Sequence, residues 1–244
     1  MELAGKAALV TGSAGRIGPA IATALARAGA DVIVHYNRSA EAAGEIADDI
    51  CRLGVKARTI QADLADPAAI EAMFAALAEP PGRLDVLVNN AAIFEPTPIE
   101  ALTAQQWDRH FAVNARAAAL CIRHALPLMR SAGGGAIVNV TDVGAEKGWP
   151  GYPAYCASKA ALLALTKSAA RALAGDNIRV NAVAPGLAAW GDDVTEQQRQ
   201  HILAQVPLWR AGSPEDVAAA VVFLARHDYI TGQNLRIDGG SCMG

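Results

Sequence analysis

Tyr155 and Lys159 are the two side chains in this sequence whose spacing best suits proton transfer. They lie four residues apart in an Ala-rich stretch of helical period, so both project from one face of a predicted helix. A free tyrosine has a pKa of about 10, so acid or base chemistry near neutral pH needs a positive charge close to the phenol. The same pair is common on helix surfaces, so its function depends on what the fold places around it.

Asp142 is the third candidate for this chemistry. It lies thirteen residues before Tyr155 and follows the apolar run 136–140. A carboxyl group beside a tyrosine could relay a proton or hold the phenol in place, but the spacing alone does not show that the fold brings the two residues together. The alternative is an aspartate that caps a turn at a strand end in an inactive protein.

A glycine-rich segment, Thr11 to Gly18, follows a short apolar run and precedes a predicted helix. In that context glycines let the backbone approach a pyrophosphate, which N–H groups at the helix start can bind. Gly12, Arg16, Ile17 and Gly18 are therefore predicted to bind a cofactor. The alternative is a tight turn that only reverses the chain.

The second predicted strand ends in Tyr36-Asn37-Arg38-Ser39, with no acidic residue where a carboxylate would bind a ribose 2′-hydroxyl. A guanidinium and a hydroxyl can instead bind a 2′-phosphate through charge-assisted hydrogen bonds. We therefore predict NADPH rather than NADH as the cofactor. The alternative for Arg38 is an ordinary solvated surface arginine.

Short apolar runs alternate with longer Ala-rich stretches along the 244 residues. This rhythm predicts an α/β fold: one Rossmann-type, doubly wound domain with a parallel sheet of about seven strands and helices on both faces. The predicted strands lie at residues 7–10, 32–34, 57–60, 86–88, 136–140, 180–183 and 235–237. The predicted helices lie near 17–28, 40–53, 67–78, 104–130, 154–174 and 214–226.

The segment 187–212 interrupts this rhythm and contains two tryptophans and a short helical piece near 195–205. It is too long for a plain connection, so we predict a lid over a ligand site. The alternative is a helical insertion that only packs against the domain.

The composition of the chain limits the kinds of molecule that it is expected to bind. Apolar residues make up 52% of the chain and charged residues 18%, and the net charge of −3 argues against nucleic acid or an anionic membrane as the main partner. The four cysteines have no metal-binding or disulfide spacing, and the first residues lack a targeting pattern. We predict a cytoplasmic protein with a small-molecule substrate and no metal.

Several of these segments together resemble the short-chain dehydrogenase/reductase family over nearly the whole chain. The motifs are residues 11–18, Asn89–Ala91, Asn114, Tyr155 with Lys159, Pro185–Gly186 and 238–240. The resemblance implies hydride transfer from a nicotinamide, with Tyr155 as proton donor, Lys159 on the nicotinamide ribose and Asn114 holding a water relay. It implies further cofactor contacts at Asp63, Leu64, Asn90, Ala91, Pro185 and Gly186.

Two departures from the family pattern resemble one branch, the pteridine reductases. Arg16 replaces a glycine and Asp142 replaces the usual serine. The segment 35–40 is similar to that branch's NADPH 2′-phosphate segment, and Phe94 matches a phenylalanine that stacks on the pterin. The implied substrate-binding residues are Arg16, Phe94, Asp142, Tyr152, Tyr155 and Leu187.

At two positions the chain differs from the pteridine reductases, so the size of the predicted substrate pocket is undecided. Ala92 stands where the branch usually has a serine, and Trp149 is bulkier than the aliphatic residue expected there. Alternatively, Phe94 is an aromatic side chain that only packs in the core after the fourth predicted strand.

The resulting hypothesis is an NADPH-dependent pteridine reductase, with Tyr155 and Asp142 supplying the proton to a ring C=N bond. One alternative is a general ketone or 3-oxoacyl reductase of the same family, and another is a non-catalytic NADP-binding sensor or scaffold. The family resemblance also implies a homotetramer.

Overall fold

Seven short apolar runs pair side by side as strands, and every pairing is parallel. Their order across the sheet is β3-β2-β1-β4-β5-β6-β7. This computed structural model describes residues 1–79, 82–190 and 195–243. The strands are β1 (Ala7–Val10), β2 (Asp31–Tyr36), β3 (Ala57–Gln61), β4 (Val86–Asn89), β5 (Gly135–Val140), β6 (Ile178–Pro185) and β7 (Asn234–Ile237). The predicted single-domain, seven-stranded parallel fold is confirmed.

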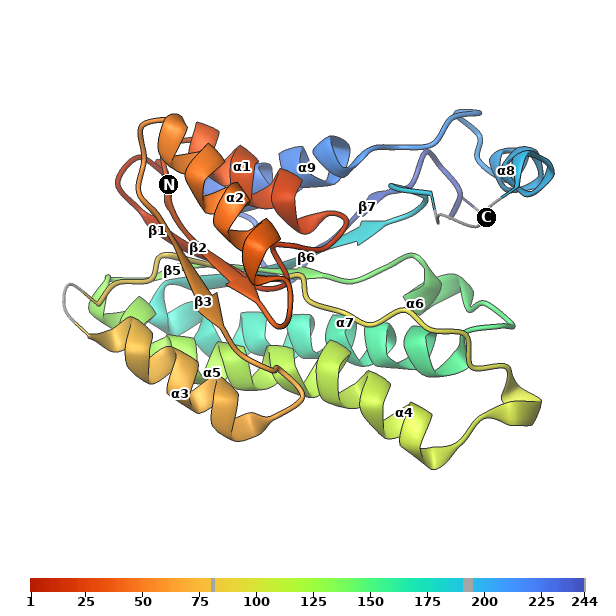
Figure 1. Ribbon diagram of the computed structural model, residues 1–244, viewed down its shortest axis with the longest axis horizontal. Coiled ribbons are helices and arrows are strands. Elements are labelled where there is room, and N and C mark those ends of the chain that lie inside the picture. Colours follow the sequence, from red (N-terminus) through yellow and green to blue (C-terminus); the bar gives the residue numbers. More distant parts are fainter. Residues whose placement is uncertain (80–81, 191–194, 244) are drawn as a thin grey trace.

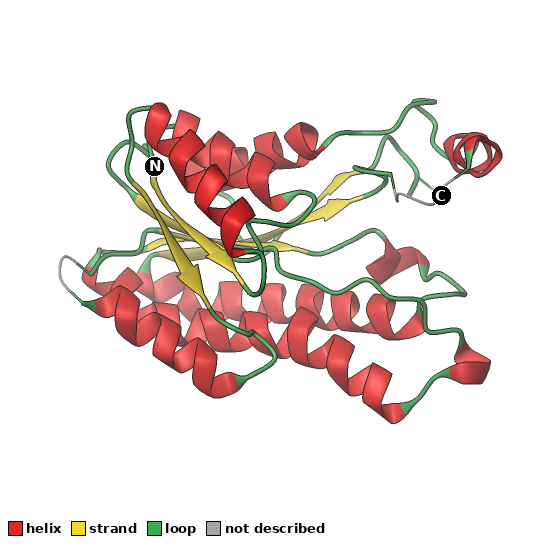
Figure 2. Ribbon diagram, viewed as in Figure 1, coloured by secondary structure: helices red, strands yellow, loops and turns green. Residues whose placement is uncertain are grey.

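Helices cover both faces of the sheet (Figure 1). One layer contains α1 (Gly18–Arg27), α2 (Ala40–Arg52) and α9 (Pro214–Arg226). The other contains α3 (Pro67–Ala78), α4 (Ala104–Phe111), α5 (Ala117–Ser131) and α7 (Pro153–Leu173). Figure 2 shows the sheet lying between these two layers.

The central strands are buried on both faces because their side chains alternate between two apolar cores. Val10 and Val88 face the core beneath α1 and α9. Leu9 and Leu87 face the core beneath α3 and α5. A strand with apolar neighbours on both sides must be apolar at every position, which is why the sequence shows short uninterrupted runs.

Two helices begin where the sequence has a capping side chain directly before a proline, Asp66-Pro67 and Ser213-Pro214. Asp66 accepts a hydrogen bond from the backbone N–H of Ala68 at 2.9 Å, directly before Pro67 at the start of α3. Ser213 likewise caps α9, accepting from the backbone N–H of Asp216 at 3.2 Å.

The predicted uninterrupted helix over 104–130 is wrong in one respect. Between α4 and α5 the chain forms a π-helical turn, η2 (Ala112–Arg116). A π turn holds one extra residue per turn, and the apolar period of the sequence does not show where that residue lies. The turn places Asn114 in the buried interior.

The strand order reverses between β1 and β4, since the chain first builds outward to β3 and then returns to the other side of β1. Ligands of open α/β sheets bind at the carboxyl ends of the strands beside such a reversal. Among the described residues, no helix combines the length and apolar character that crossing a bilayer requires.

Because the central strands are buried on both faces, shortening a side chain there should destabilise the protein more than shortening one on an edge strand. Leu87→Ala, on fully buried β4, is expected to lower the free energy of unfolding by about 2–5 kcal/mol, because it leaves a cavity in a packed core. Leu235→Ala, on the edge strand β7 and 37% exposed, should cost about 1 kcal/mol or less. Urea unfolding of both variants measures the difference, and equal losses would contradict the assignment of the core.

Candidate active site

The glycine turn after β1 has the close packing that a pyrophosphate cradle requires. Gly12 has φ of +65°, and a Cβ there would lie 2.8 Å from the Cα of Ala91. A Cβ on Gly18 would collide with the carbonyl oxygen of Gly12. Helix α1 begins at Gly18 without a side-chain cap, which leaves its first N–H groups for an anion. These residues fit the predicted dinucleotide.

The segment after β4 braces this turn. The backbone N–H groups of Asn90 and Ala91 donate to Thr11 Oγ1 at 2.9 and 3.0 Å. The Asn90 amide donates to the carbonyls of Thr11 and Gly12 at 2.9 and 3.1 Å. Asn90 and Ala91 were predicted to bind the cofactor; the contacts they make in the structure hold the glycine turn.

His35 supports the glycine turn, a role that the sequence did not predict for it. Its Nδ1 accepts the backbone N–H of Gly12 at 3.0 Å, and its Nε2 lies 3.2 Å from the carbonyl of Ala62. One ring nitrogen must accept and the other donate, so the imidazole is neutral. Burial lowers the pKa of His35 to about 4. The sequence does indicate that His35 has a hydrogen-bond partner, because a histidine in the apolar strand Asp31–Tyr36 needs a polar partner.

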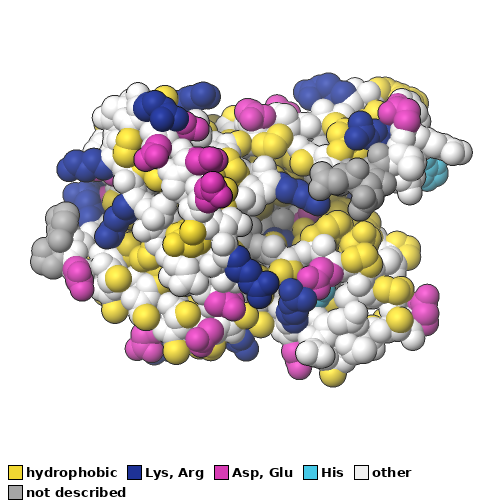
Figure 3. All heavy atoms as spheres, in the orientation of Figure 1, with side chains coloured by type: hydrophobic (Ala, Val, Ile, Leu, Met, Phe, Trp, Pro, Cys, Tyr) yellow, Lys and Arg dark blue, Asp and Glu magenta, His cyan; other side chains and the backbone are white. Residues whose placement is uncertain are grey.

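The predicted 2′-phosphate segment lies just after β2, where Asn37, Arg38 and Ser39 are all exposed. Arg16 is also exposed, beside the glycine turn. Figure 3 shows a hollow in this face of the molecule with Lys and Arg side chains beside it. Exposed guanidinium groups at such a position suit a phosphorylated ligand.

Asp63 and Leu64, which follow β3 and were predicted to contact the cofactor, differ in burial. Asp63 is exposed and accepts the backbone N–H of Ala65 at 2.9 Å. Leu64 is buried in the core below α3, and Tyr36, at the end of β2, is half-buried.

Asp142 and Tyr155 meet as predicted. The Tyr155 hydroxyl donates to Asp142 Oδ2 at 2.8 Å, and Asp142 Oδ1 accepts the backbone N–H of Gly144 at 2.7 Å. Burial raises the pKa of the Asp142 carboxyl. Burial and the neighbouring Asp142 raise the pKa of Tyr155 well above its usual value. Tyr155 is therefore protonated near neutral pH and available as a proton donor.

Lys159 lies behind this pair. Its Nζ donates to the carbonyl of Val140 at 2.7 Å and is 5.7 Å from the centre of the Tyr155 ring. Burial lowers the pKa of Lys159 to about 8, opposed by the charge of Asp142. Burial and Asp142 are the main causes that raise the pKa of Tyr155, and the expectation that this lysine favours the phenolate stays a prediction.

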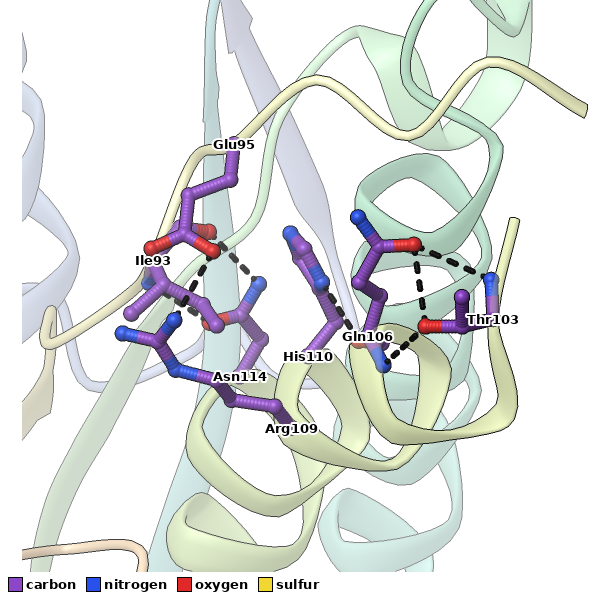
Figure 4. Close-up of polar contacts among 7 residues, drawn as sticks. All are labelled: Ile93, Glu95, Thr103, Gln106, Arg109, His110 and Asn114. Carbon is purple, nitrogen blue, oxygen red and sulfur yellow. Dashed lines mark hydrogen bonds and ion pairs between the residues drawn. The ribbon is translucent and has the colours of Figure 1, made fainter. Parts of the chain in front are cut away.

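Asn114 projects from the π turn towards the segment after β4 (Figure 4). Its Oδ1 accepts the backbone N–H of Ile93 at 2.8 Å, and its Nδ2 lies 3.0 Å from both the Ile93 carbonyl and Ser158 Oγ. Arg109, on the same helical path, pairs with Glu95 at 3.0 Å. These contacts hold the chain on either side of Phe94. The predicted water relay through Asn114 stays a prediction.

Tyr155 belongs to a cluster of four aromatic rings, with Phe94, Trp149 and Tyr152. Phe94 stacks on Tyr152 with ring centres 4.4 Å apart and an interplanar angle of 5°. Phe94 meets Tyr155 edge-on at 4.7 Å, and Trp149 lies parallel to Tyr155 at 6.1 Å. Phe94 is 45% exposed, so it is not the core aromatic of the alternative interpretation. Tyr152 covers one face of the Phe94 ring.

The end of β6 closes the site. Gly186 donates its N–H to Ile237, and a Cβ there would lie 2.9 Å from the Cα of Asp238, so β6 and β7 approach too closely for a side chain. The carbonyl of Leu187 accepts the N–H of Gly212 at 2.9 Å, which joins the two ends of the segment 187–212. Pro185, the last residue of β6, is buried.

The predicted lid contains one helix, α8 (Glu196–Leu203), which Thr195 caps. Residues 191–194 of the lid lie outside the described part of the chain. Among the residues that the structure does describe, no group of three or more His, Cys, Asp or Glu side chains is placed to hold a metal ion.

The buried His35 predicts a pH dependence of stability. Its pKa is 6.5 in the unfolded chain and about 4 when folded, so between these values only the unfolded state binds the proton. Stability from the neutral ring is complete above pH 6.5 and decreases as the pH falls to 4, by about 3 kcal/mol in total. Urea unfolding across this range should show a shallower slope for His35→Asn. The exposed His227→Asn is the control, and an unchanged slope in the His35 variant would contradict the assignment.

Comparisons with known proteins agree with this geometry. Residues 12–242 match the family described as "Enoyl-(Acyl carrier protein) reductase". The 3-oxoacyl-[acyl-carrier-protein] reductase FabG of Staphylococcus aureus is 40% identical over 242 residues, covering 98% of each chain. The 3-oxoacyl-[acyl-carrier-protein] reductase of Synechocystis is 38% identical over 245 residues, covering 99% of this chain and 98% of the relative.

Solved structures show the same relationship. A putative short-chain alcohol dehydrogenase from Sinorhizobium meliloti superposes with a TM-score of 0.94 at 36% identity, covering 100% of this chain and 98% of its own. Acetoin dehydrogenase YohF from Salmonella typhimurium gives a TM-score of 0.90 at 36% identity, with 98% and 97% covered. These names do not confirm the pteridine branch. With its Tyr155 and Lys159 on α7 and its glycine turn after β1, the chain belongs to the short-chain dehydrogenase/reductase family of oxidoreductases.

Proposed function

We propose that the protein is an NADPH-dependent reductase in which Tyr155 delivers the proton. The observation that carries the proposal is the hydrogen bond of 2.8 Å from the Tyr155 hydroxyl to Asp142, with Lys159 behind it. NADPH, when bound, would supply the hydride to the substrate carbon. The exposed Arg38 and Ser39, with no acidic residue beside them, support a cofactor that has a 2′-phosphate.

The chain's own groups suit proton delivery to a developing negative charge. Tyr155 remains protonated because burial and Asp142 raise its pKa. Asp142 accepts the phenol hydrogen bond and fixes the ring, and its carboxyl can return a proton to the phenol. Lys159, with its pKa near 8, can take up or release a proton behind the ring. The Asn114 amide fixes the strand-end segment from which Phe94 projects.

A 3-oxoacyl thioester or a related ketone is the first candidate substrate. It is supported by the names of the curated relatives, which are similar to this chain over almost their whole length. Reduction of a ketone needs one hydride and one proton at a carbonyl, which the Tyr155 hydroxyl can supply.

A pteridine is the second candidate, favoured by two features of the site. Asp142 stands where the family usually has a serine, and it can help deliver a proton to a ring nitrogen. Phe94 is 45% exposed, so its ring can contact a flat heteroaromatic ligand. Tyr152 already stacks on one face of Phe94, so that face is not available to the ligand.

We also propose a lid and a homotetramer. The segment 187–212, joined at its ends by Leu187 and Gly212, would cover the substrate. The apolar helices α5 and α7 would supply faces for a homotetramer. A cytoplasmic location remains a prediction as well.

A substrate panel tests the proposal. NADPH oxidation is followed with a short 3-oxoacyl thioester, simple ketones, dihydrobiopterin and dihydrofolate. Turnover of the thioester and ketones alone would support the first candidate, and turnover of the pteridines alone the second. NADPH binding without turnover of any compound would refute a reductase and favour the sensor or scaffold alternative.

Phe94→Ala separates the two candidates further. If a flat ring stacks on Phe94, the KM for dihydrobiopterin should rise about tenfold, since an aromatic stack is worth on the order of 1 kcal/mol beyond the buried area. The KM for NADPH should be unchanged. Phe223→Ala is the matched control, because that ring is 48% exposed on α9, away from the site. An unchanged pteridine KM would remove the stacking argument.

Arg38→Ala tests the choice of cofactor. A charge-assisted hydrogen bond to a phosphate is worth about 1.5–3 kcal/mol, so the KM for NADPH should rise about 10- to 100-fold while that for NADH stays constant. Arg27→Ala removes the same charge from an exposed site on α1 and is the control. Equal effects on NADPH and NADH would argue against a 2′-phosphate at Arg38.

A further inference from the structure

One side chain of the edge strand β7 holds the turn that contains Asp142 at two points. Asn234 Oδ1 accepts the Thr141 hydroxyl at 3.0 Å, and Asn234 Nδ2 donates to Glu146 Oε1 at 2.9 Å. Thr141 directly precedes Asp142, and Glu146 lies in the short helix α6 (Gly144–Lys147) that follows it. The two hydrogen bonds therefore bracket Asp142 in sequence.

Further contacts fix the far side of α6 to the chain beyond β7. The second carboxylate oxygen of Glu146 pairs with Arg236, and Lys147 Nζ donates to the carbonyl of Ser241 at 2.7 Å. Asp238 orders that segment by accepting the backbone N–H groups of Gly240 and Cys242 at 3.0 and 2.8 Å. Helix α6 thus rests on a hydrogen-bonded support rather than on a free loop.

On its inner side α6 packs closely against Asp142 and is hydrogen-bonded to it. The Gly144 N–H donates to Asp142 Oδ1, and a Cβ on Gly144 would lie 3.1 Å from that oxygen. The same Cβ would lie 3.3 Å from both Cys156 Sγ and the Trp149 ring. A shift of α6 would therefore change the position of the Asp142 carboxyl directly.

We propose that Asn234 and Glu146 are positioning residues for Asp142, holding its carboxyl at hydrogen-bonding distance from the Tyr155 hydroxyl. A carboxyl group that must meet a phenol within a few tenths of an ångström needs neighbours that restrict its own conformations. Thr141 is buried and its hydroxyl also lies 2.9 Å from the carbonyl of Val183, so Asn234 joins Asp142 to both β6 and β7. The proposal rests on the proposed function in that Asp142 takes part in proton delivery.

Asn234→Ala is the direct test. With the substrate that the panel identifies, kcat should fall about tenfold, as is typical for residues that orient a reacting group, while the KM for NADPH changes less than about twofold. Combining it with Asp142→Asn should cause no loss beyond that of Asp142→Asn alone, because the two residues act through one group. Additive losses would overturn the proposal.

A second readout needs no substrate and so separates this proposal from the proposed function. The Asp142 carboxyl can be titrated by carbon NMR in the cofactor-free protein and assigned by comparison with Asp142→Asn. Tyr155, Lys159 and Cys156 are the titratable groups that affect it or are affected by it. Burial raises the pKa of Asp142, and its hydrogen bonds with Gly144 and Tyr155 lower it, so loosening the turn in Asn234→Ala should shift that pKa.

Matched variants keep the test decisive. Gln233→Ala alters the neighbouring exposed side chain and should leave both kcat and the Asp142 titration unchanged. Glu146→Gln retains an oxygen for Asn234 and should keep most of the activity, whereas Glu146→Ala should behave like Asn234→Ala. Glu146 is exposed, so its variants test the proposal even if Asn234→Ala does not fold. Unchanged kcat and an unchanged Asp142 titration in Asn234→Ala or Glu146→Ala would refute the positioning role.

Discussion

The burial of three ionisable groups at the end of β5 is the constraint on which the active site depends. Asp142, Tyr155 and Lys159 all lie where water is scarce, so each must find a polar partner in the protein. The Gly144 N–H and the Val140 carbonyl supply two of these partners, and the hydrogen bond from Tyr155 to Asp142 supplies the third. The same burial keeps the phenol protonated, which is the state that a reductase needs in a proton donor.

In the glycine turn after β1, buried polar groups also find partners within the protein, and there the partners are neutral. The glycine turn has backbone groups that cannot pair within a strand or helix, and Asn90 and His35 bind them. His35 remains neutral because burial disfavours its cation, so it binds the Gly12 N–H without adding a charge to the turn that we propose for the cofactor phosphates. These hydrogen bonds hold the turn without a ligand, which would lower the entropic cost of binding one.

The names of the relatives and the residues around Tyr155 support different proposed substrates. Nearly full-length similarity reports the shared sheet and helices, which fix the Tyr155 and Lys159 machinery. Substrate choice depends on the segments beyond the strand ends, where this chain has Asp142 and the cluster of Phe94, Trp149, Tyr152 and Tyr155. Those segments can change while the catalytic frame stays the same.

The sequence by itself determined the fold class, the seven strands and the helix starts at Asp66 and Ser213, which follow from local apolar runs and capping residues that are readable in order along the chain. The pairing of Asp142 with Tyr155 was expected from the family resemblance, and the tertiary structure shows the hydrogen bond between them. Only the tertiary structure decided the π turn at Asn114 and the tautomer of His35. It also decided that Phe94 stacks on Tyr152 and that the pKa of Tyr155 rises rather than falls. Each of these depends on burial and on partners distant in sequence, such as Ala62, Tyr152 and Asp142, and no periodicity along the chain encodes such contacts.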